Sequence, residues 1–278
     1  MSAERGTAFL MPAALLLASV TVFPIAYLLW LSLQLRSPIA GPPRFIGLAN
    51  YWRLLEDERF WNALVNTAYF TALSVLLELV FGMAIALLLR RVFPGRGFVY
   101  ALVLAPWAIP TAVSARMWEW MYNAEFGVLN YLLGIEIAWL GSPAAAIHAA
   151  IAMDVWKSTP FVAVLLLAGL AAIPEDLYRA AALDGAGRWT RFTRITLPLL
   201  RPLIAVVLIF RTIDAVRVFD SIYVLTGGGP ADTTETLSIY AYKALFQTLE
   251  FGYGSAVAVT TFMLVALVTA LYARFLRT

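Results

Sequence analysis

Residues 66–89 read NTAYFTALSVLLELVFGMAIALLL, and this run decides the class of protein. Its one charged residue is Glu78, and most other positions carry leucine, alanine, valine or aromatic side chains. The hydrocarbon core of a bilayer is about 30 Å thick, and a helix of about 20 apolar residues crosses it. The stretch is therefore long and apolar enough to predict a membrane-spanning helix.

The composition of the whole chain agrees with this prediction. Of its 278 residues, 62% are hydrophobic and 13% are charged, whereas soluble domains average about half apolar and about a quarter charged residues. A single water-soluble globule is disfavoured, because it could not bury so much apolar surface. The chain has no cysteine and one histidine. This excludes a disulfide scaffold, a thiolate metal site and the H-E-x-x-H zinc motif, so we expect no metal site.

Five further stretches have the same apolar character. The six predicted spans are approximately 7–35, 66–89, 98–122, 144–172, 199–225 and 254–276. The first follows a short leader, residues 1–6, and is too long for the apolar core of a signal peptide, so we interpret it as an uncleaved span. The sequence predicts an all-α polytopic membrane protein in which residues 1–278 form one transmembrane domain.

The basic residues predict the orientation of these spans, because cytoplasmic loops carry an excess of lysine and arginine. With the N-terminus inside, eleven basic residues fall in cytoplasmic segments and five in external ones. The cytoplasmic residues are Arg5, Arg90, Arg91, Arg96, Arg179, Arg188, Arg191, Arg194, Arg201, Arg274 and Arg277, and the external ones are Arg36, Arg44, Arg53, Arg59 and Lys243. We therefore expect both termini to be cytoplasmic.

Two segments are predicted to depart from straight spanning helices. The external loop from Arg36 to about Ala63 contains an amphipathic pattern over residues 50–61. This pattern fits a helix at the membrane surface, and it also fits a docking surface for an external partner. In the third span, Pro106 and Pro110 predict a kink or a locally unwound backbone, because proline removes helical hydrogen bonds.

The cytoplasmic segment 174–198, PEDLYRAAALDGAGRWTRFTRITLP, is the most informative loop. Pro174 and the two acids after it predict a helix start, and Asp184-Gly185 predicts a turn. A second, basic helix is predicted over residues 186–195, ended by Leu197-Pro198. Two interpretations are open for such a helix–turn–helix, insertion into a groove on another protein or an amphipathic loop on the inner leaflet.

The spacing within this loop resembles that of a known family. Ala180-Ala181, Gly185, Ile195 and Leu197-Pro198 match the intervals of the EAA loop of binding-protein-dependent ABC importer permeases. The resemblance implies the type I ABC importer permease fold, in which this loop is a coupling helix seated in a cleft of the ATP-binding subunit. The residues that it implies in ATPase coupling are Arg179, Ala180, Ala181, Asp184, Gly185 and Ala186. Arg179 departs from the pattern, because the family carries glutamate there.

Three other segments narrow the resemblance to sugar permeases. They are residues 105–110, 154–161 and 219–230, the last reading FDSIYVLTGGGP. The resemblance implies an importer of trehalose or maltose, with glycerol 3-phosphate or another polyol as the alternative. It also implies that the protein lies in a bacterial or archaeal cytoplasmic membrane. The partners that it implies are a second homologous permease subunit, two ATP-binding cassette subunits, an extracytoplasmic solute-binding protein and the lipid bilayer. No nucleic acid is expected among them. The binding protein is expected on segments 36–63 and 233–251.

The chain lacks a site for ATP. A P-loop requires the pattern G-x-x-x-x-G-K-[ST], and neither Lys157 nor Lys243, the two lysines of the chain, stands in that context. We therefore expect a transport subunit and not an enzyme, with no cofactor of its own and with ATP and Mg²⁺ on the partner ATPase. A secondary transporter is the alternative from another class, but it usually carries an inverted repeat, and the two halves of this sequence show none.

The fifth span carries unusual charges for a membrane helix. Arg211, Asp214, Arg217 and Asp220 alternate in sign at three-residue spacing. A charge at the bilayer centre costs about 2.5–3.5 kcal/mol on insertion scales, so these groups should face one another or a cavity. They fit a ladder of pairs along the helix, and they also fit a polar lining for a hydroxyl-rich solute. With Asn66 and Glu78 they are the candidate substrate pathway, although Glu78 is favoured for helix packing.

Overall fold

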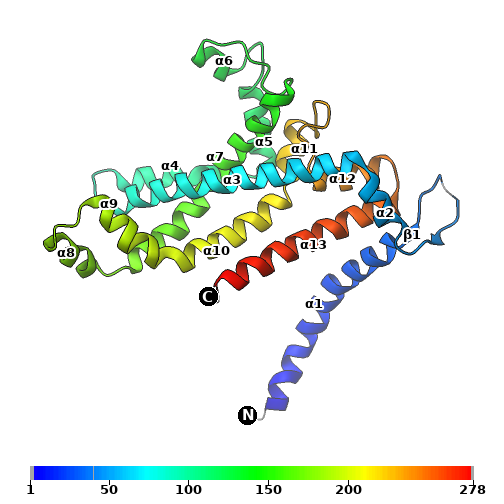
Figure 1. The fold of residues 1–278 in the computed structure, drawn as a ribbon, viewed down its shortest axis with the longest axis horizontal. Coiled ribbons are helices and arrows are strands. Elements are labelled where there is room, and N and C mark those ends of the chain that lie inside the picture. Colours follow the sequence, from blue (N-terminus) through cyan, green and yellow to red (C-terminus); the bar gives the residue numbers. More distant parts are fainter. Residues whose placement is uncertain (1–2, 40, 277–278) are drawn as a thin grey trace. The chain divides into compact units, whose positions relative to one another are not determined.

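The computed structural model describes residues 3–39 and 41–276, and most of them are helical (Figure 1). The chain divides into two compact units, Met1–Trp61 with Tyr240–Met263 and Asn62–Ile239 with Leu264–Thr278. Residues 1–2, which belong to the leader predicted over residues 1–6, lie outside the described residues. So do residues 277–278 at the C-terminal end.

The first unit is organised around the end of α1 (Ala3–Ser32). The chain then passes through a short antiparallel pair, β1 (Gln34–Leu35) and β2 (Arg44–Phe45), into α2 (Ala49–Glu56). Asn50 of α2 donates its amide to the carbonyl oxygens of Ser32 and Gln34 at 2.8 and 2.9 Å. The bond to Ser32 satisfies an acceptor that the end of α1 leaves without a helical partner, and the bond to Gln34 ties α2 to β1. The unit also holds the π-helix η2 (Lys243–Gln247) and the first part of α13 (Phe251–Leu276).

The amphipathic helix predicted over residues 50–61 is in fact two helices. α2 ends at Glu56, Asp57 is extended with φ −88° and ψ 105°, and α3 (Glu58–Arg90) begins directly after it. The Asp57 carboxylate accepts a hydrogen bond from the Arg59 N–H at 2.9 Å, as the side chain at a helix N-cap does. This carboxylate therefore marks the start of α3 inside what looks like one amphipathic pattern.

The second unit contains long apolar helices that pack closely. α7 (Pro143–Ala172) packs against α4 (Arg96–Ala108) and against α10 (Leu197–Val216). A Cβ at Gly82 of α3 would lie 2.6 Å from Val162 of α7, and one at Gly169 of α7 would lie 2.3 Å from Leu203 of α10. Small residues at such contacts let membrane helices approach closely. The unit's shorter helices include α5 (Thr111–Met121), α6 (Val128–Leu133) and α11 (Asp220–Leu225), and the first half of α12 (Leu237–Tyr242) also belongs to it.

Four described helices are long and apolar enough to cross a membrane: α1 from Met11, α3, α7, and α13 as far as Tyr272. The predicted third span is a pair of helices, α4 and α5, bent by 99° across Ile109 and Pro110. It adds a fifth span if the pair crosses as one. The all-helical, polytopic prediction is confirmed, and the third span breaks where its prolines predicted a kink.

The predicted fifth span, 199–225, is wrong at both ends. Its helix begins upstream, because α9 (Arg188–Arg191) continues through the π-helix η1 (Phe192–Thr196) into α10, and it ends at Val216. The Leu197 N–H donates to Phe192 O, five residues back. This wider turn accommodates Pro198, whose ring would clash with the carbonyl four residues earlier in an α-helix. Leu197-Pro198 therefore does not end the second helix predicted in segment 174–198.

Candidate functional site

A buried arginine on α10 contacts carboxylates of its own helix and of two other helices in the second unit. Arg211 donates its Nε to Glu78 Oε2 of α3 at 2.5 Å and its Nη2 to Glu78 Oε1 at 2.8 Å. Its Nη1 lies 2.5 Å from Asp214 Oδ2, one turn further along α10, and its Nη2 lies 3.4 Å from Asp154 Oδ2 of α7. The guanidinium and Glu78 form the bidentate pair for which arginine geometry is best suited.

The residues of this cluster, Arg211 with Glu78, Asp154 and Asp214, differ in how deeply they are buried. Glu78 is 0% exposed and Arg211 is 5% exposed, whereas the Asp214 side chain is 63% exposed. Glu78 and Arg211 compensate each other's charge inside the bundle, which makes both tolerable at membrane depth. Glu78 thus links α3 to α10, in keeping with the packing role favoured for it, and Asp214 faces open space.

The ladder predicted along the fifth span is limited to the step from Arg211 to Asp214. α10 ends at Val216, so Arg217 and Asp220 do not continue its face. Arg217 donates its Nε to Ile213 O at 3.2 Å, and Asp220 stands in the first turn of α11. In the part of the chain that the structure describes, no ion pair joins Arg217 to either aspartate. No proline or glycine marks the end of α10 in the sequence, which is why the helix was predicted to continue.

Asn66 of α3 forms hydrogen bonds to the loop that precedes α12. Its amide donates to the backbone carbonyls of Asp232 and Glu235 at 3.0 and 3.1 Å. Asn62, one turn earlier on α3, also donates to Asp232 O, at 2.9 Å. These bonds tie α3 to the loop before α12. Two of the six pathway candidates, Asn66 and Glu78, therefore make structural contacts between elements.

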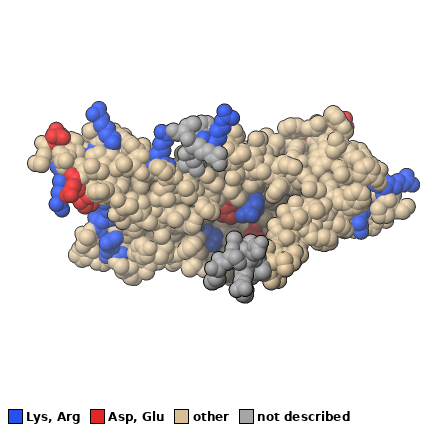
Figure 2. Space-filling view, turned by 90° about the horizontal axis from the view of Figure 1, so that it is seen from below, with Lys and Arg blue, Asp and Glu red and all other residues tan. Residues whose placement is uncertain are grey.

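A polar pocket of ≈ 710 Å³ lies at the exposed side of the cluster and is lined by residues of α4, α5, α7 and α10. Its charged lining residues are Lys157, Arg211, Asp214 and Arg217. A smaller pocket of ≈ 160 Å³ shares three of these, Lys157, Asp214 and Arg217, and adds Asp154 and Asp220. Figure 2 shows acidic and basic side chains together in a recess near the middle of one face, with further charged side chains toward the ends and edges of that view. Four of the pathway candidates thus line one polar region.

In the loop predicted to be cytoplasmic, residues 174–198, the first helix ends with a complete Schellman motif. α8 (Glu175–Leu183) is followed by Asp184 and then by Gly185, whose φ of +81° is left-handed. The Gly185 N–H donates to Ala182 O at 3.1 Å, and the Ala186 N–H donates to Ala181 O at 2.8 Å. These bonds satisfy carbonyls at the helix end, and glycine adopts this φ without steric cost. The turn predicted at Asp184-Gly185 is confirmed.

The N-terminal end of α8, its base, contacts α3 and η1. Arg90, the last residue of α3, pairs with Glu175 at 2.5 Å and lies over the ring of Tyr178, 4.4 Å from its centre. The hydroxyls of Tyr178 and Thr196 of η1 are hydrogen-bonded at 2.9 Å. A displacement of α8 would therefore be transmitted to both α3 and the helix that continues as α10.

The predicted coupling residues lie beyond this base, and none of the α8 residues is buried. Arg179, which replaces the glutamate of the family pattern, has its Nη1 3.6 Å from Asp176 Oδ1 on its own helix. Leu183 and Trp189 flank the turn and are 90% and 74% exposed. The turn thus presents two large apolar side chains to the surroundings of the chain.

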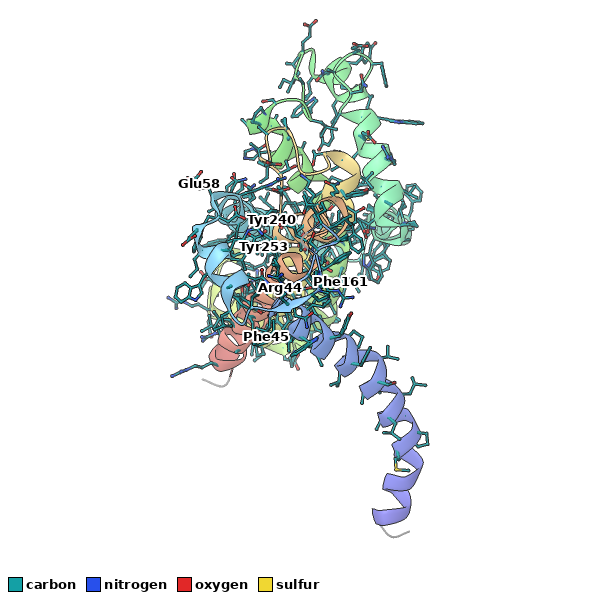
Figure 3. The ribbon with its side chains drawn as sticks, turned by 90° about the vertical axis from the view of Figure 1, so that its right-hand side faces the viewer. Arg44, Phe45, Glu58, Phe161, Tyr240 and Tyr253 are labelled. Atoms are coloured by element: carbon teal, nitrogen blue, oxygen red, sulfur yellow. The ribbon has the colours of Figure 1, made fainter. Side chains whose placement is uncertain are left out.

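The first unit holds a polar cluster that sequence reasoning missed. The Asp57 carboxylate accepts hydrogen bonds from the hydroxyls of Tyr240 and Tyr253, which lie close together in Figure 3. Arg53 pairs with both carboxylate oxygens of Glu250 at 3.1 and 3.0 Å, and its guanidinium lies 4.1 Å from the Tyr253 ring centre. Arg53 and Glu250 are 197 positions apart. Only the charges of segment 36–63 signalled this cluster in the sequence, because its partners come from the distant end of the chain.

This cluster predicts a dependence of stability on pH. Although partial burial opposes the effect, hydrogen bonds from Tyr240, Tyr253 and the N–H groups of Arg59 and Phe60 lower the pKa of Asp57 below its ordinary value of 3.8. Such a carboxylate stabilises the fold above its ordinary pKa and loses that contribution as the pH falls through the folded value. We expect Tm of the purified protein to begin to fall at about pH 5 and to keep falling as the pH drops through 3.8 and below it. Asp57→Asn should lower Tm at neutral pH and flatten this dependence, and equal slopes in both proteins would contradict the role of Asp57.

Comparison with known proteins gives consistent matches, the relatives covering nearly the whole chain. The sequence family described as binding-protein-dependent transport system inner membrane component matches residues 78–278. The trehalose/maltose transport system permease protein MalF of Thermococcus litoralis is 44% identical over 97% of this chain and 92% of its own length. The trehalose transport system permease protein SugA of Mycobacterium tuberculosis is 45% identical over 97% of this chain and 88% of its own length. A bacterial alginate ABC transporter, solved in complex with an alginate pentasaccharide-bound periplasmic protein, matches 96% of this chain and 91% of the compared chain, with TM-score 0.84 and 25% identity.

Proposed function

Because the chain belongs to the family of binding-protein-dependent transport system inner membrane components, we propose that it is a permease subunit of an ATP-driven importer for a disaccharide such as trehalose or maltose. It forms half of the translocation pathway beside a second, similar permease subunit. Two ATP-binding cassette subunits and an extracytoplasmic solute-binding protein complete the transporter. The relatives named for trehalose and for trehalose/maltose support a disaccharide over glycerol 3-phosphate or another polyol.

The geometry of the cytoplasmic loop carries this proposal. α8 is exposed, ends at the left-handed Gly185, and is joined at its base to α3 by Arg90 and Glu175. ATP and Mg²⁺ bind to the partner ATPase, and this chain needs no cofactor of its own. When the ATPase subunits close, they move α8 as a rigid body, and its base passes the movement to the spanning helices.

The polar pocket is the route of the solute. Carboxylate and guanidinium groups form strong hydrogen bonds to hydroxyls, and Asp214 and Arg217 are exposed on its wall. Trp107 and Phe161 line the same pocket with their ring centres 6.0 Å apart. A wall that combines aromatic faces with a few placed polar groups is typical of a small-molecule site.

The binding protein docks on the external face of the first unit. Segments 36–63 and 233–251 contribute to that face, and Arg53 with Glu250 joins them. Both termini lie in the cytoplasm of a bacterial or archaeal cell, and the distribution of basic residues supports this orientation. A solved relative of this fold carries a periplasmic protein in complex.

Copurification tests the assignment of the loop. In the chain expressed with its partner subunits, Leu183→Asp together with Trp189→Asp should abolish recovery of the ATPase subunits, because two charges replace the exposed apolar side chains beside the turn. Leu133→Asp on α6 is the matched control, since Leu133 is also exposed, at 58%, and should leave recovery unchanged. Recovery of the ATPase at the wild-type level with the double variant would contradict the assignment.

A further inference from the structure

The break in the third span leaves polar backbone groups in the second unit. α4 ends at Ala108, Ile109 is extended with φ −77° and ψ 134°, and Pro110 precedes α5. The last carbonyls of a helix have no partner within it, and Pro110 has no N–H with which to supply one. At membrane depth such groups must be satisfied by the protein itself.

Lys157 of α7 satisfies one of these carbonyls. Its Nζ lies 2.5 Å from Ile109 O, across 48 positions of sequence. A cation beside the C-terminal end of a helix is also favourable for the helix dipole. Among the described residues, Lys157 has no carboxylate within ion-pair distance, so its short contact is with the backbone of the break.

The break forms part of the wall of the polar pocket. Trp107, Ile109, Pro110 and Thr111 line this pocket, as does Lys157 itself. The same lysine contributes to the smaller pocket with Asp154 and Asp214. The contact between Lys157 and Ile109 therefore sets where one wall of the pocket stands relative to α7.

We propose that Lys157 is a positioning residue for transport, which caps α4 at Ile109 and so fixes the break between α4 and α5 against α7. The proposal rests on the function of the pocket as the route of the solute. An alternative role for this lysine, a direct hydrogen bond to the solute, predicts different results in the experiment below. If Lys157 positions the break, its replacement changes the exposure of the backbone there even when no solute is present. If Lys157 only binds the solute, its replacement leaves that exposure unchanged.

A thiol-labelling experiment separates these roles, and the absence of cysteine from the chain provides the background for it. Thr111→Cys places one thiol at the first residue of α5, in both pockets. In the purified full transporter without solute, adding Lys157→Met should raise the rate of labelling by a water-soluble maleimide by at least about fivefold, because the uncapped break loses its position. Adding Lys157→Arg should restore the slow rate, since a guanidinium can donate to the same carbonyl.

Uptake of labelled trehalose by the same transporters gives the second measurement. Lys157→Met should lower the maximal rate by at least about fivefold, and Lys157→Arg should recover most of it. Arg116→Met, which removes an exposed cation of α5 paired with Glu119, is the control and should change neither rate. Unchanged labelling in Lys157→Met would overturn the proposal, whatever happens to uptake. Wild-type transporter that takes up no sugar would refute the proposed function alone, because the labelling requires no solute.

Discussion

Replacing Arg211 by methionine should lower the free energy of unfolding by about 3–5 kcal/mol. The substitution leaves Glu78, which is fully buried, without the guanidinium that compensates its charge. An uncompensated buried carboxylate is costly in either form, because it must stay charged without a partner or take up a proton. Chemical unfolding of the detergent-purified protein, followed by tryptophan fluorescence, measures the effect.

Two further variants make this prediction specific. The double variant Glu78→Met with Arg211→Met should recover much of the lost stability, since replacing both members of a buried pair by apolar residues is often neutral. Asp214→Asn should cost far less than Arg211→Met, because the Asp214 side chain is 63% exposed. Equal stability of Arg211→Met and the wild type would show that the pair does not hold α3 to α10.

Gly185→Val should uncouple ATP hydrolysis from transport. A valine at φ +81° costs at least about 1–2 kcal/mol in a left-handed conformation, so the turn after α8 must rearrange. We expect uptake to fall at least about tenfold. Basal ATPase activity should remain, but its stimulation by the sugar-loaded binding protein should be lost.

Gly187→Val is the matched control for this variant. Gly187 has φ −65° and ψ 170°, an extended conformation that valine adopts readily. A Cβ at either glycine would meet no atom within 4 Å, so the two variants differ in backbone conformation and not in crowding. Full uptake together with full stimulation of the ATPase in Gly185→Val would contradict the coupling role of the turn.

Local patterns predicted much of the fold. The apolar run around Glu78 predicted a spanning helix, and Asp184-Gly185 predicted the turn after α8. The prolines at 106 and 110 predicted the break in the third span. Each of these depends on residues close in sequence, whose propensities act directly. Pro198 predicts a helix end that the structure does not have, because η1 accommodates the proline. A π turn has no comparable signature in one sequence.

The candidate site was less predictable, because its contacts are distant in sequence. Arg211 and Asp214 were expected to pair along α10, and they do. The stronger contact, between Arg211 and Glu78, spans 133 positions and depends on how α3 and α10 are aligned. Lys157 at Ile109 and Asn66 at the loop before α12 are similar cases. The sequence shows that such polar groups need partners in a membrane, but only the packing of the helices decides which partners they find.

Uptake of radiolabelled trehalose into proteoliposomes tests the central claim most directly. The purified transporter is reconstituted with ATP and Mg²⁺ enclosed, and the solute-binding protein and sugar are added outside. We predict that trehalose accumulates inside, and that accumulation requires both the enclosed ATP and the binding protein. Accumulation that needs neither, and instead follows an imposed proton or sodium gradient, would contradict the assignment of this chain as an ATP-driven permease subunit.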